Sequence, residues 1–541
     1  MNRLLLGILL TLLLPLSIRA QEVLVYETEI PILIDREDND LFEIRVDSPN
    51  GGLFNNLTLA LSKDVHLEDI HALKLYYAGT ESAVRKEQDA TRPALEYVPR
   101  NEAGKTRKAN LTYSILKSEA TPLTHDVTLS ANQQLFPGTN YFWVSIAMKP
   151  GASILNKITA DISSIHINGI KTPFTRKNKV RTHYLGVGVR HAGDDGSAAY
   201  RIPGIATTLQ GTLLGVYDIR WNSSKDLQEF IEIGVSRSTD KGQTWEPMRI
   251  AMTMADEGSL PKAQNGVSDP AILVDETTGT IWVVAAYAHG QGRGASWTSS
   301  QPGMDADHTC QLLMVKSEDD GKTWSKPINL TEQLKSPEWH YLLQGPGRGI
   351  TMSNGTLVFA GQFIDAQRVP NACIMYSKDH GKTWNISKLA RTNTTEAQVA
   401  ELEPGVLMLN MRDNRGGSRA VSTTTDMGES WYEHKSSRSA LKEPICMASL
   451  ISVKAKDNIL GKDLLLFSNP NHTKQRKDIT IKISFDGGYT WPEESQIKLD
   501  AEPGWGYSCL TMIDRETVGI LYESSAAQMT FQAIKLRDFI H

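Results

Sequence analysis

Cysteine is scarce in this chain, and the spacing of the few cysteines excludes several kinds of site. Only four occur in 541 residues, and no two of them form a C-x-x-C pair. Most metal sites built on cysteine need such close pairs, and the sequence predicts neither a metal site nor a cofactor. We expect buried free thiols at Cys310, Cys373, Cys446 and Cys509.

Long apolar runs are also scarce, and the clearest one is short. Arg3 precedes an apolar run from Leu4 to Leu16, which is too short to span a bilayer comfortably and is typical of a signal peptide. We predict a signal peptide at residues 1–20, with cleavage near Ala20. No cysteine at that junction could carry a lipid anchor, and no later segment is apolar enough for a transmembrane helix. The mature protein is expected to be exported, to the periplasm or the extracellular space.

An excess of one charge sign is missing as well. The formal net charge is -5, from 57 lysines and arginines against 62 acidic residues. This balance argues against a protein that coats nucleic acid, although a local basic pocket could still bind an anion. With 40% hydrophobic and 22% charged residues, the composition is that of an ordinary globular protein.

The chain is longer than one hydrophobic core usually organises, so we expect two domains. The first part carries alternating strand-like runs, such as 57–61 and 141–146, separated by turn signals such as Pro137-Gly138-Thr139-Asn140. These runs predict an N-terminal β-sandwich over 22–180, which is a candidate for carbohydrate binding. A basic stretch at 176–181 marks the boundary and is expected to be a solvated linker.

An internal repeat follows the boundary. Five octapeptides match Ser/Thr-x-Asp-x-Gly-x-Thr/Ser-Trp, and their aspartates are separated by 79, 60, 47 and 60 residues. In such a turn the aspartate accepts backbone N–H bonds, the glycine supplies a positive φ, and the tryptophan packs between strands. The five octapeptides are 238–245, 317–324, 377–384, 424–431 and 484–491.

The gaps between these repeats match one four-stranded propeller blade with variable loops. Region 190–541 divided among six blades gives about 59 residues for each blade. The sequence therefore predicts an all-β chain in which a six-bladed β-propeller follows the sandwich. The sixth blade lacks the octapeptide, and we expect it to join the first and last strands of its domain.

The motif Tyr200-Arg201-Ile202-Pro203 before a series of such Asp boxes resembles the sialidase (neuraminidase) family, over roughly 190–541. This resemblance implies an exo-α-sialidase, a glycosidase that acts on terminal sialic acid. Sialic acid carries a carboxylate on its anomeric carbon, and arginine binds a carboxylate with planar two-pronged geometry that lysine lacks. By resemblance to the family's three arginines, Arg201, Arg412 and Arg476 would bind that carboxylate.

The nucleophile implied by the resemblance is a tyrosine. A carboxylate attacking beside the substrate's carboxylate would be repelled, whereas a neutral phenol activated by a base would not, and sialidases are the known exception to the two-carboxylate rule. Tyr507 stands where the family has this tyrosine, and Glu396 resembles its partner glutamate. Because a phenol has an ordinary pKa near 10, the glutamate would accept its proton.

The resemblance also implies an acid/base residue in the loop after the first blade's strand. We expect Asp226 in this role, with Asp218 as the competitor and Arg220 as an accessory substrate-binding residue. Glu523 resembles the acid that braces Arg201, as a bidentate pair. Asp269 and Gln344 are weaker candidates for lining the glycerol or N-acetyl side of the pocket.

Three alternatives share some of these features. A catalytically inactive sialic-acid lectin would need the arginines but not Tyr507, Glu396 and Asp226 together. Another Asp-box protein would lack the three-arginine pattern, and a trans-sialidase would differ only in what intercepts the intermediate, with Trp505 as a conceivable acceptor platform. We expect a retaining hydrolase acting on sialylated oligosaccharides, glycoproteins or glycolipids, monomeric and without a nucleic-acid partner.

Overall fold

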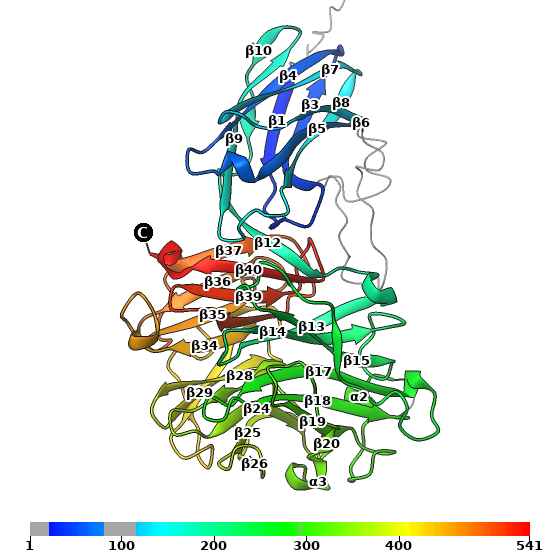
Figure 1. Ribbon diagram of the computed structural model, residues 1–541, viewed down its shortest axis with the longest axis vertical. Helices are drawn as coiled ribbons and strands as arrows, with labels where there is room; N and C mark the ends of the chain where they lie inside the picture. Colours follow the sequence, from blue (N-terminus) through cyan, green and yellow to red (C-terminus); the bar gives the residue numbers. More distant parts are fainter. Residues whose placement is uncertain (1–20, 81–114, 292–293, 541) are drawn as a thin grey trace, which may run out of the picture.

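The structure is a computed structural model that describes residues 21–80, 115–291 and 294–540 (Figure 1). The predicted signal peptide at 1–20 lies outside this range. Strands dominate the described chain, and the α-helices in it, α2 (Ser296–Ser299) and α3 (Thr331–Leu334), are single turns. None of its helices is long and apolar enough to cross a membrane. The predicted all-β class is confirmed.

Two sheets form the N-terminal part of the chain (Figure 1). Along β4, Leu57, Leu59 and Leu61 are buried and alternate with less buried residues, as expected for a strand with one face on a core. Phe54 of β4 stacks on Phe142 of β8 with ring centroids 4.2 Å apart, so the two sheets share that core. One sheet contains β1 (Glu22–Glu27), β3 (Asn39–Ser48), β5 (Ile70–Thr80), β6 (Ile115–Ala120), β8 (Gly138–Met148) and β11 (Thr175–Arg176); the other contains β4 (Gly52–Leu61), β7 (Asp126–Leu135), β9 (Lys157–Ile167) and β10 (Ile170–Thr172).

Strand β12 (Thr182–Arg190) connects this part to the rest of the chain. It pairs antiparallel with β9 at one end and with β40 at the other, while β2 (Ile32–Leu33) pairs with it in parallel. One nine-stranded sheet therefore contains strands from both predicted domains. The basic stretch beside β12 is not free in solvent, because Arg176 pairs with buried Glu27 and Arg181 lies 3.1 Å from the Glu29 carboxylate.

The remaining strands form six antiparallel arrays of four strands each within the described residues. The sixth array combines three strands from the end of the chain with β12. Short strands extend some arrays, and β30 pairs with β33 apart from them. The arrays are β13 (Ala199–Thr207), β14 (Leu213–Arg220), β15 (Ile231–Ser238) and β16 (Arg249–Met252); β17 (Asn265–Val274), β18 (Ile281–His289), β19 (Gln311–Ser317) and β20 (Ile328–Asn329); β21 (Tyr341–Gln344), β24 (Leu357–Ile364), β25 (Pro370–Ser377) and β26 (Asn385–Ile386); β28 (Thr394–Glu403), β29 (Val406–Asp413), β31 (Ala420–Thr424) and β32 (Tyr432–Glu433); β34 (Ser449–Val453), β35 (Leu464–Pro470), β36 (Ile479–Ser484) and β37 (Gln496–Asp500); and β38 (Ser508–Met512), β39 (Thr517–Tyr522), β40 (Met529–Lys535) and β12.

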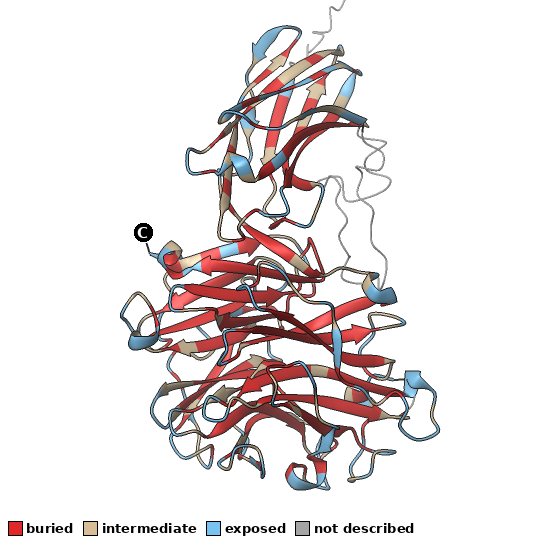
Figure 2. Cartoon of the chain, viewed as in Figure 1, coloured by how far each residue is buried: buried red, intermediate tan, exposed pale blue. Residues whose placement is uncertain are grey.

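Each array packs against the next, and buried positions follow the strands while exposed ones gather in the loops (Figure 2). A separate buried cluster joins each consecutive pair, and a further one joins the sixth array to the first. The cores thus connect the arrays in a closed order. Residues that share a cluster are Leu214 with Val283, Leu273 with Phe359, Val358 with Leu409, Met408 with Phe467, Leu466 with Ile520, and Phe531 with Leu213.

The Asp boxes form the turns that follow the third strand of the first five arrays. In the first box, Asp240 accepts bonds from the Ser238 hydroxyl (2.8 Å) and from the Thr244 N–H (2.9 Å) and hydroxyl (2.6 Å). The same bonds recur in the other four boxes. Lys241 and Gly242 both have a positive φ, of 62° and 91°, so this turn needs two left-handed residues where the sequence predicted one.

The boxes also connect neighbouring arrays. The residue after the box aspartate reaches the preceding array in three cases: Lys241 contacts Asp514 (2.8 Å), Asp320 accepts a bond from Thr208 (2.6 Å), and His380 contacts Asp275 (2.9 Å). The first of these contacts joins the first array to the sixth. These turns therefore stabilise both the hairpin and the packing of arrays.

Candidate active site

Four candidate site residues lie on or beside the first strands of their arrays, whereas Arg412 lies on the second strand β29, Arg476 lies between β35 and β36, and Asp226 lies between β14 and β15. Arg201 lies on β13, Asp269 on β17 and Glu396 on β28, and Tyr507 directly precedes β38. The pairing register of β13, β17 and β28 shifts at these positions, as in β-bulges, and Asp269 has a φ of 65°. Because a bulge redirects side chains, it can aim polar residues of a buried strand into a cavity.

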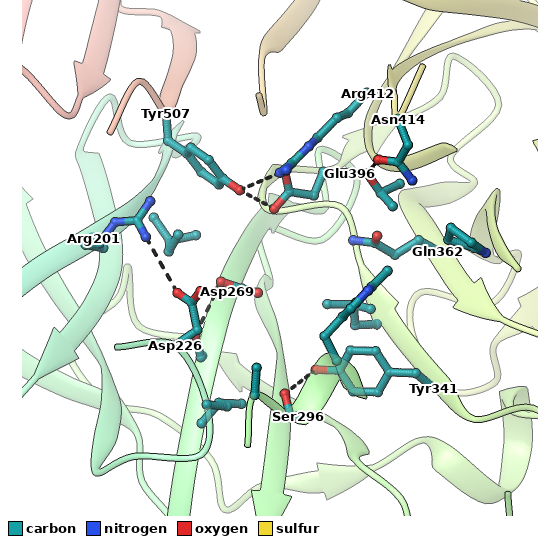
Figure 3. A pocket seen from close by; sticks show the side chains of 18 of the residues that line it. Arg201, Asp226, Asp269, Ser296, Tyr341, Gln362, Glu396, Arg412, Asn414 and Tyr507 are labelled. Atoms are coloured by element: carbon teal, nitrogen blue, oxygen red, sulfur yellow. Dashed lines mark hydrogen bonds and ion pairs between the residues drawn. The ribbon is translucent and has the colours of Figure 1, made fainter. Parts of the chain in front are cut away.

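Seven of the predicted site residues line one pocket of about 440 Å³ (Figure 3). Figure 3 shows the Tyr507 hydroxyl directed at Glu396 and Arg412, and the Arg201 guanidinium directed at Asp226. The pocket therefore combines three cations with three acids around one phenol. The seven residues are Arg201, Asp226, Asp269, Glu396, Arg412, Arg476 and Tyr507.

Tyr507 and Glu396 form a direct hydrogen bond in which the phenol donates. Arg412 Nη1 lies 2.5 Å from the second carboxylate oxygen of Glu396 and 3.1 Å from the Tyr507 hydroxyl. Burial and the Glu396 charge raise the pKa of Tyr507 well above its ordinary value, and Arg412 and Arg476 only partly offset them. The phenol is therefore protonated at neutral pH and has a base in direct contact.

All three candidate arginines surround Tyr507. The guanidinium carbon of Arg201 lies 5.3 Å from the centre of the tyrosine ring, and that of Arg476 lies 5.7 Å from it. Arg476 is fixed by bonds to the carbonyl oxygens of Trp505 (3.1 Å) and Ile445 (2.9 Å). The cationic side of the pocket is thus held in place before any ligand binds, which suits recognition of a carboxylate.

Glu523 is buried and links Arg201 to Tyr507. One carboxylate oxygen accepts bonds from Arg201 Nε (3.1 Å) and the Ile202 N–H (3.0 Å), and the other accepts the Tyr507 N–H (3.0 Å). The predicted bidentate pair with Arg201 is therefore wrong. The contact with Glu523 is made through Nε, and Arg201 Nη1 lies 3.5 Å from Asp226, which lines the pocket.

Asp226 and Asp218 occupy very different surroundings. The Asp226 side chain is 70% exposed and lines the pocket, with Oδ1 2.7 Å from Arg220 and 3.5 Å from Arg201. Partial burial raises the pKa of Asp226, but the two arginines outweigh this effect and lower it. Asp218 is fully buried and is held by Arg220, Ser268 and the Asp269 N–H, so it has no access to a ligand in the pocket.

Arg220 and Gln344 do not line the pocket. Arg220 is fully buried between Asp218 and Asp226, which is a positioning geometry and not the substrate contact expected from the sequence. Gln344 is also fully buried, and its amide donates to the carbonyl oxygen of Asp269. Asp269 itself lines the pocket, and burial together with the charge of Asp218 raises its pKa well above the ordinary value.

Sequence reasoning missed one wall of the pocket. The residues of this wall come from the segment around α2, from β21 and β24, and from the loop after β29. No local sequence motif identifies them. Trp505, considered as an acceptor platform, is buried and stacks its ring 4.9 Å from the Arg201 guanidinium, outside the pocket lining. The missed residues include Ser296, Trp297, Tyr341, Leu343, Gln362 and Asn414.

The four cysteines are buried and free, as predicted. Among the residues described, no cluster of three histidine, cysteine or acidic side chains could hold a metal ion.

Comparison with known proteins gives consistent matches along the chain. Residues 20–171 match a model described as the N-terminal domain of BNR-repeat neuraminidase, and residues 202–497 match a BNR repeat-like domain. A sialidase of Bacteroides fragilis is 60% identical over 97% of this chain and 97% of its own length. A sialidase of Micromonospora viridifaciens is 34% identical over 61% of this chain and 50% of that protein. The solved structure of Hadza microbial sialidase Hz136 is 58% identical, with a TM-score of 0.90 over 95% of this chain and 99% of that one.

Proposed function

The chain belongs to the sialidase family, and we propose that it hydrolyses terminal sialic acid from oligosaccharides, glycoproteins and glycolipids with retention of configuration, through a covalent intermediate on Tyr507. As a sialidase it is a glycoside hydrolase. The observation that carries the mechanism is the phenol of Tyr507, which contacts a carboxylate base and lies among three arginines in one pocket.

The three arginines bind the substrate's carboxylate in this proposal. Arg201, Arg412 and Arg476 approach the pocket from three arrays, and each is held by contacts outside the space that a ligand would fill. A planar carboxylate offers two oxygens to several guanidinium donors, and such charge-assisted bonds are about twice as strong as neutral ones. This clamp places the anomeric carbon, which bears the carboxylate, beside the Tyr507 hydroxyl.

The first chemical step forms a bond between Tyr507 Oη and the anomeric carbon. Glu396 accepts the phenol proton as the bond forms, since it already accepts the hydrogen bond from that hydroxyl. The bond from the anomeric carbon to the glycosidic oxygen breaks, and Asp226 donates a proton to the departing oxygen. The products of this step are the free aglycone and a sialyl-tyrosine.

Substrate binding supplies the protonated form of Asp226. In the free protein Arg220 and Arg201 keep the pKa of this carboxyl low. A substrate carboxylate on Arg201 competes with the 3.5 Å contact to Asp226 and adds a nearby negative charge. Both effects raise the pKa of Asp226, so the acid gains its proton as the substrate arrives.

The second step hydrolyses the intermediate. Asp226, now ionised, removes a proton from a water molecule that attacks the anomeric carbon. The bond to Tyr507 Oη breaks, and the phenolate recovers its proton from Glu396. Each step inverts the anomeric carbon, so the released sialic acid has the configuration of the substrate.

We assign the architecture as a six-bladed β-propeller preceded by a β-sandwich. The propeller is supported by the six four-stranded arrays, by the cores that join them in a closed order, and by the sixth array, which joins β12 to the last strands of the chain. The sandwich is supported by the core that the two N-terminal sheets share. The blades of a propeller surround a central channel, and Arg201, Asp269 and Glu396 come from the first strands of three different arrays.

Proton NMR of a sialyl-lactose digest tests this function. We expect the α-anomer of sialic acid to appear first and to mutarotate to the β-anomer afterwards. Initial release of the β-anomer would contradict the double displacement. Accumulation of a transferred sialoside in place of free sialic acid would identify a trans-sialidase, and tight binding without turnover would identify a lectin.

A further inference from the structure

The N-terminal sheets reach the catalytic pocket through one short segment. Residues 29–36 lie against two loops: 501–507, which connects the fifth array to the sixth, and 523–528, which connects β39 to β40. The Glu29 carbonyl accepts the Ala501 N–H at 2.7 Å, and Arg36 Nη1 donates to the Ala526 carbonyl at 2.8 Å. Leu33 is fully buried in a cluster with Ala526 and Ala527.

This segment is rigidly attached to the N-terminal part. The Asn39 side chain accepts the Leu33 N–H (2.8 Å) and donates to the carbonyls of Leu33 (2.9 Å) and Ile146 (3.2 Å). On its other side, β2 pairs with β12, and the Ile34 N–H donates to the Gly186 carbonyl at 2.9 Å. A segment fixed at both sides can transmit the position of the N-terminal sheets to the loops that it touches.

The contacted loop 523–528 fixes Arg201 and the backbone of Tyr507. Glu523 binds Arg201 Nε, the Ile202 N–H and the Tyr507 N–H, and the Gln528 side chain accepts the Tyr200 N–H at 2.8 Å. Both sides of the Tyr200-Arg201-Ile202 segment therefore depend on this loop. A displacement of a catalytic group by about 1 Å can cost on the order of 100-fold in rate, so support of the loop matters for turnover.

We propose that the segment 29–36 of the N-terminal part is a positioning element for the active site, which acts by fixing loop 523–528 and through it Arg201 and Tyr507. Arg36, at the end of this segment, is the positioning residue, since its guanidinium binds the carbonyl of Ala526 within that loop. This role rests on the proposed sialidase function and assigns the N-terminal part a task beyond carbohydrate binding.

The test compares Arg36→Ala, Arg36→Lys and Arg45→Ala in the full chain. Arg45 lies on β3 of the same part and pairs with Asp47, away from loop 523–528, so it is the matched control. For Arg36→Ala we expect kcat/KM on sialyl-lactose to fall about 5- to 30-fold, which is less than the roughly 100-fold cost of a 1 Å displacement of a catalytic group, because Arg36 acts through loop 523–528. The Kd of 2-deoxy-2,3-didehydro sialic acid should rise in parallel, because Arg201 loses its fixed orientation.

Further readouts separate positioning from general destabilisation. Amide hydrogen exchange in 523–528 should accelerate in Arg36→Ala, while Arg36→Lys, which can still donate to the Ala526 carbonyl, should recover most of the activity. Wild-type kcat/KM and inhibitor affinity in Arg36→Ala would overturn the proposal, as would an equal loss in Arg45→Ala. A wild-type protein that releases no sialic acid would instead refute the function itself.

Discussion

At the scale of single residues, the pocket places a neutral phenol between a carboxylate base and three arginines. Burial and Glu396 keep Tyr507 protonated, while the arginines that would bind a carboxylate surround it. The neutral phenol avoids the repulsion that an attacking carboxylate would meet beside an anionic substrate. Its proton has one direct acceptor, Glu396, so activation of the nucleophile is coupled to a single contact.

Substitution of Arg412 by lysine tests the carboxylate clamp. Lysine keeps the positive charge but loses the planar pair of donors, and it cannot contact Glu396 and a ligand in the same way. We expect kcat/KM on sialyl-lactose to fall about 10- to 150-fold, the loss of roughly 1.5–3 kcal/mol for a hydrogen bond to a charged group. Steady-state kinetics, with circular dichroism to confirm folding, measures this effect.

Arg415→Lys is the control for that experiment. Arg415 lies three residues further along, bonds to Asp413 and is 40% exposed outside the pocket lining. Its replacement should leave both kinetic constants unchanged. A wild-type Michaelis constant and turnover in Arg412→Lys would remove Arg412 from the clamp.

The sequence located the charged half of the pocket better than the other half. Arg201, Glu396 and Tyr507 could be found because each stands in a short pattern that resembles a family motif. Gln362 and Tyr341 could not, since each is one side chain within an ordinary buried strand and its direction depends on how six arrays converge. Arg220 was predicted near the pocket but with the wrong role, because the sequence around a single charged residue does not show whether it is buried.

At the scale of elements, the Asp boxes could be predicted almost completely. Their spacing gave the periodicity, and the predicted bonds of the aspartate appear in all five turns. Two features were beyond the pattern. The residue after the aspartate is left-handed as well as the glycine, and in three of the five turns that residue reaches the preceding array, a contact between segments far apart in sequence.

Replacement of Asp240 by alanine tests the structural role of a box. The turn loses the bonds to Ser238 and Thr244, so we expect the free energy of unfolding to fall by about 1–3 kcal/mol. The kcat of the folded variant should stay at the wild-type value, since the box lies outside the pocket lining. Denaturant unfolding and activity at a permissive temperature measure the two quantities.

The stability lost in Asp240→Ala should depend on pH. Burial raises the pKa of Asp240, but the bonds from Thr244 outweigh it, so the folded pKa lies below the ordinary value. A depressed pKa contributes stability above the unfolded pKa of about 3.9 that is lost as pH falls through the folded pKa. The difference in the free energy of unfolding between wild type and Asp240→Ala should therefore have its full size at pH 6 and decrease below pH 4. Asp256→Ala, at an exposed aspartate, should unfold with the wild-type free energy. A stability difference between wild type and Asp240→Ala that does not change with pH would contradict this prediction.

At the scale of the whole molecule, the two predicted domains share structure. One buried cluster contains Phe54 and Leu59 of the N-terminal sheets together with Leu213 and Phe531 of the arrays. Strand β12 pairs with both parts. The boundary near 180 stays a prediction from composition, and the shared core could not be predicted, because it forms between segments hundreds of residues apart.

This shared core predicts cooperative unfolding of the entire chain. Differential scanning calorimetry should show one transition whose calorimetric and van't Hoff enthalpies agree, since neither part can lose its core alone. Leu185→Ala, in the middle of β12, should lower the midpoint of that one transition without splitting it. Two resolved transitions, or an isolated 190–541 fragment that unfolds at the wild-type temperature, would show that the parts are independent.

The central claim is that Tyr507 attacks the anomeric carbon, and covalent trapping tests it most directly. A 3-fluoro sialyl fluoride should form a stable adduct, because the 3-fluorine destabilises the positively charged transition states while the good leaving group still permits the first step. Peptide mass spectrometry of the trapped protein should place the sugar on Tyr507. Tyr507→Phe keeps the ring, so it should fold and bind the didehydro analogue but form no adduct. An adduct on any other residue, or an adduct that persists in Tyr507→Phe, would contradict the account.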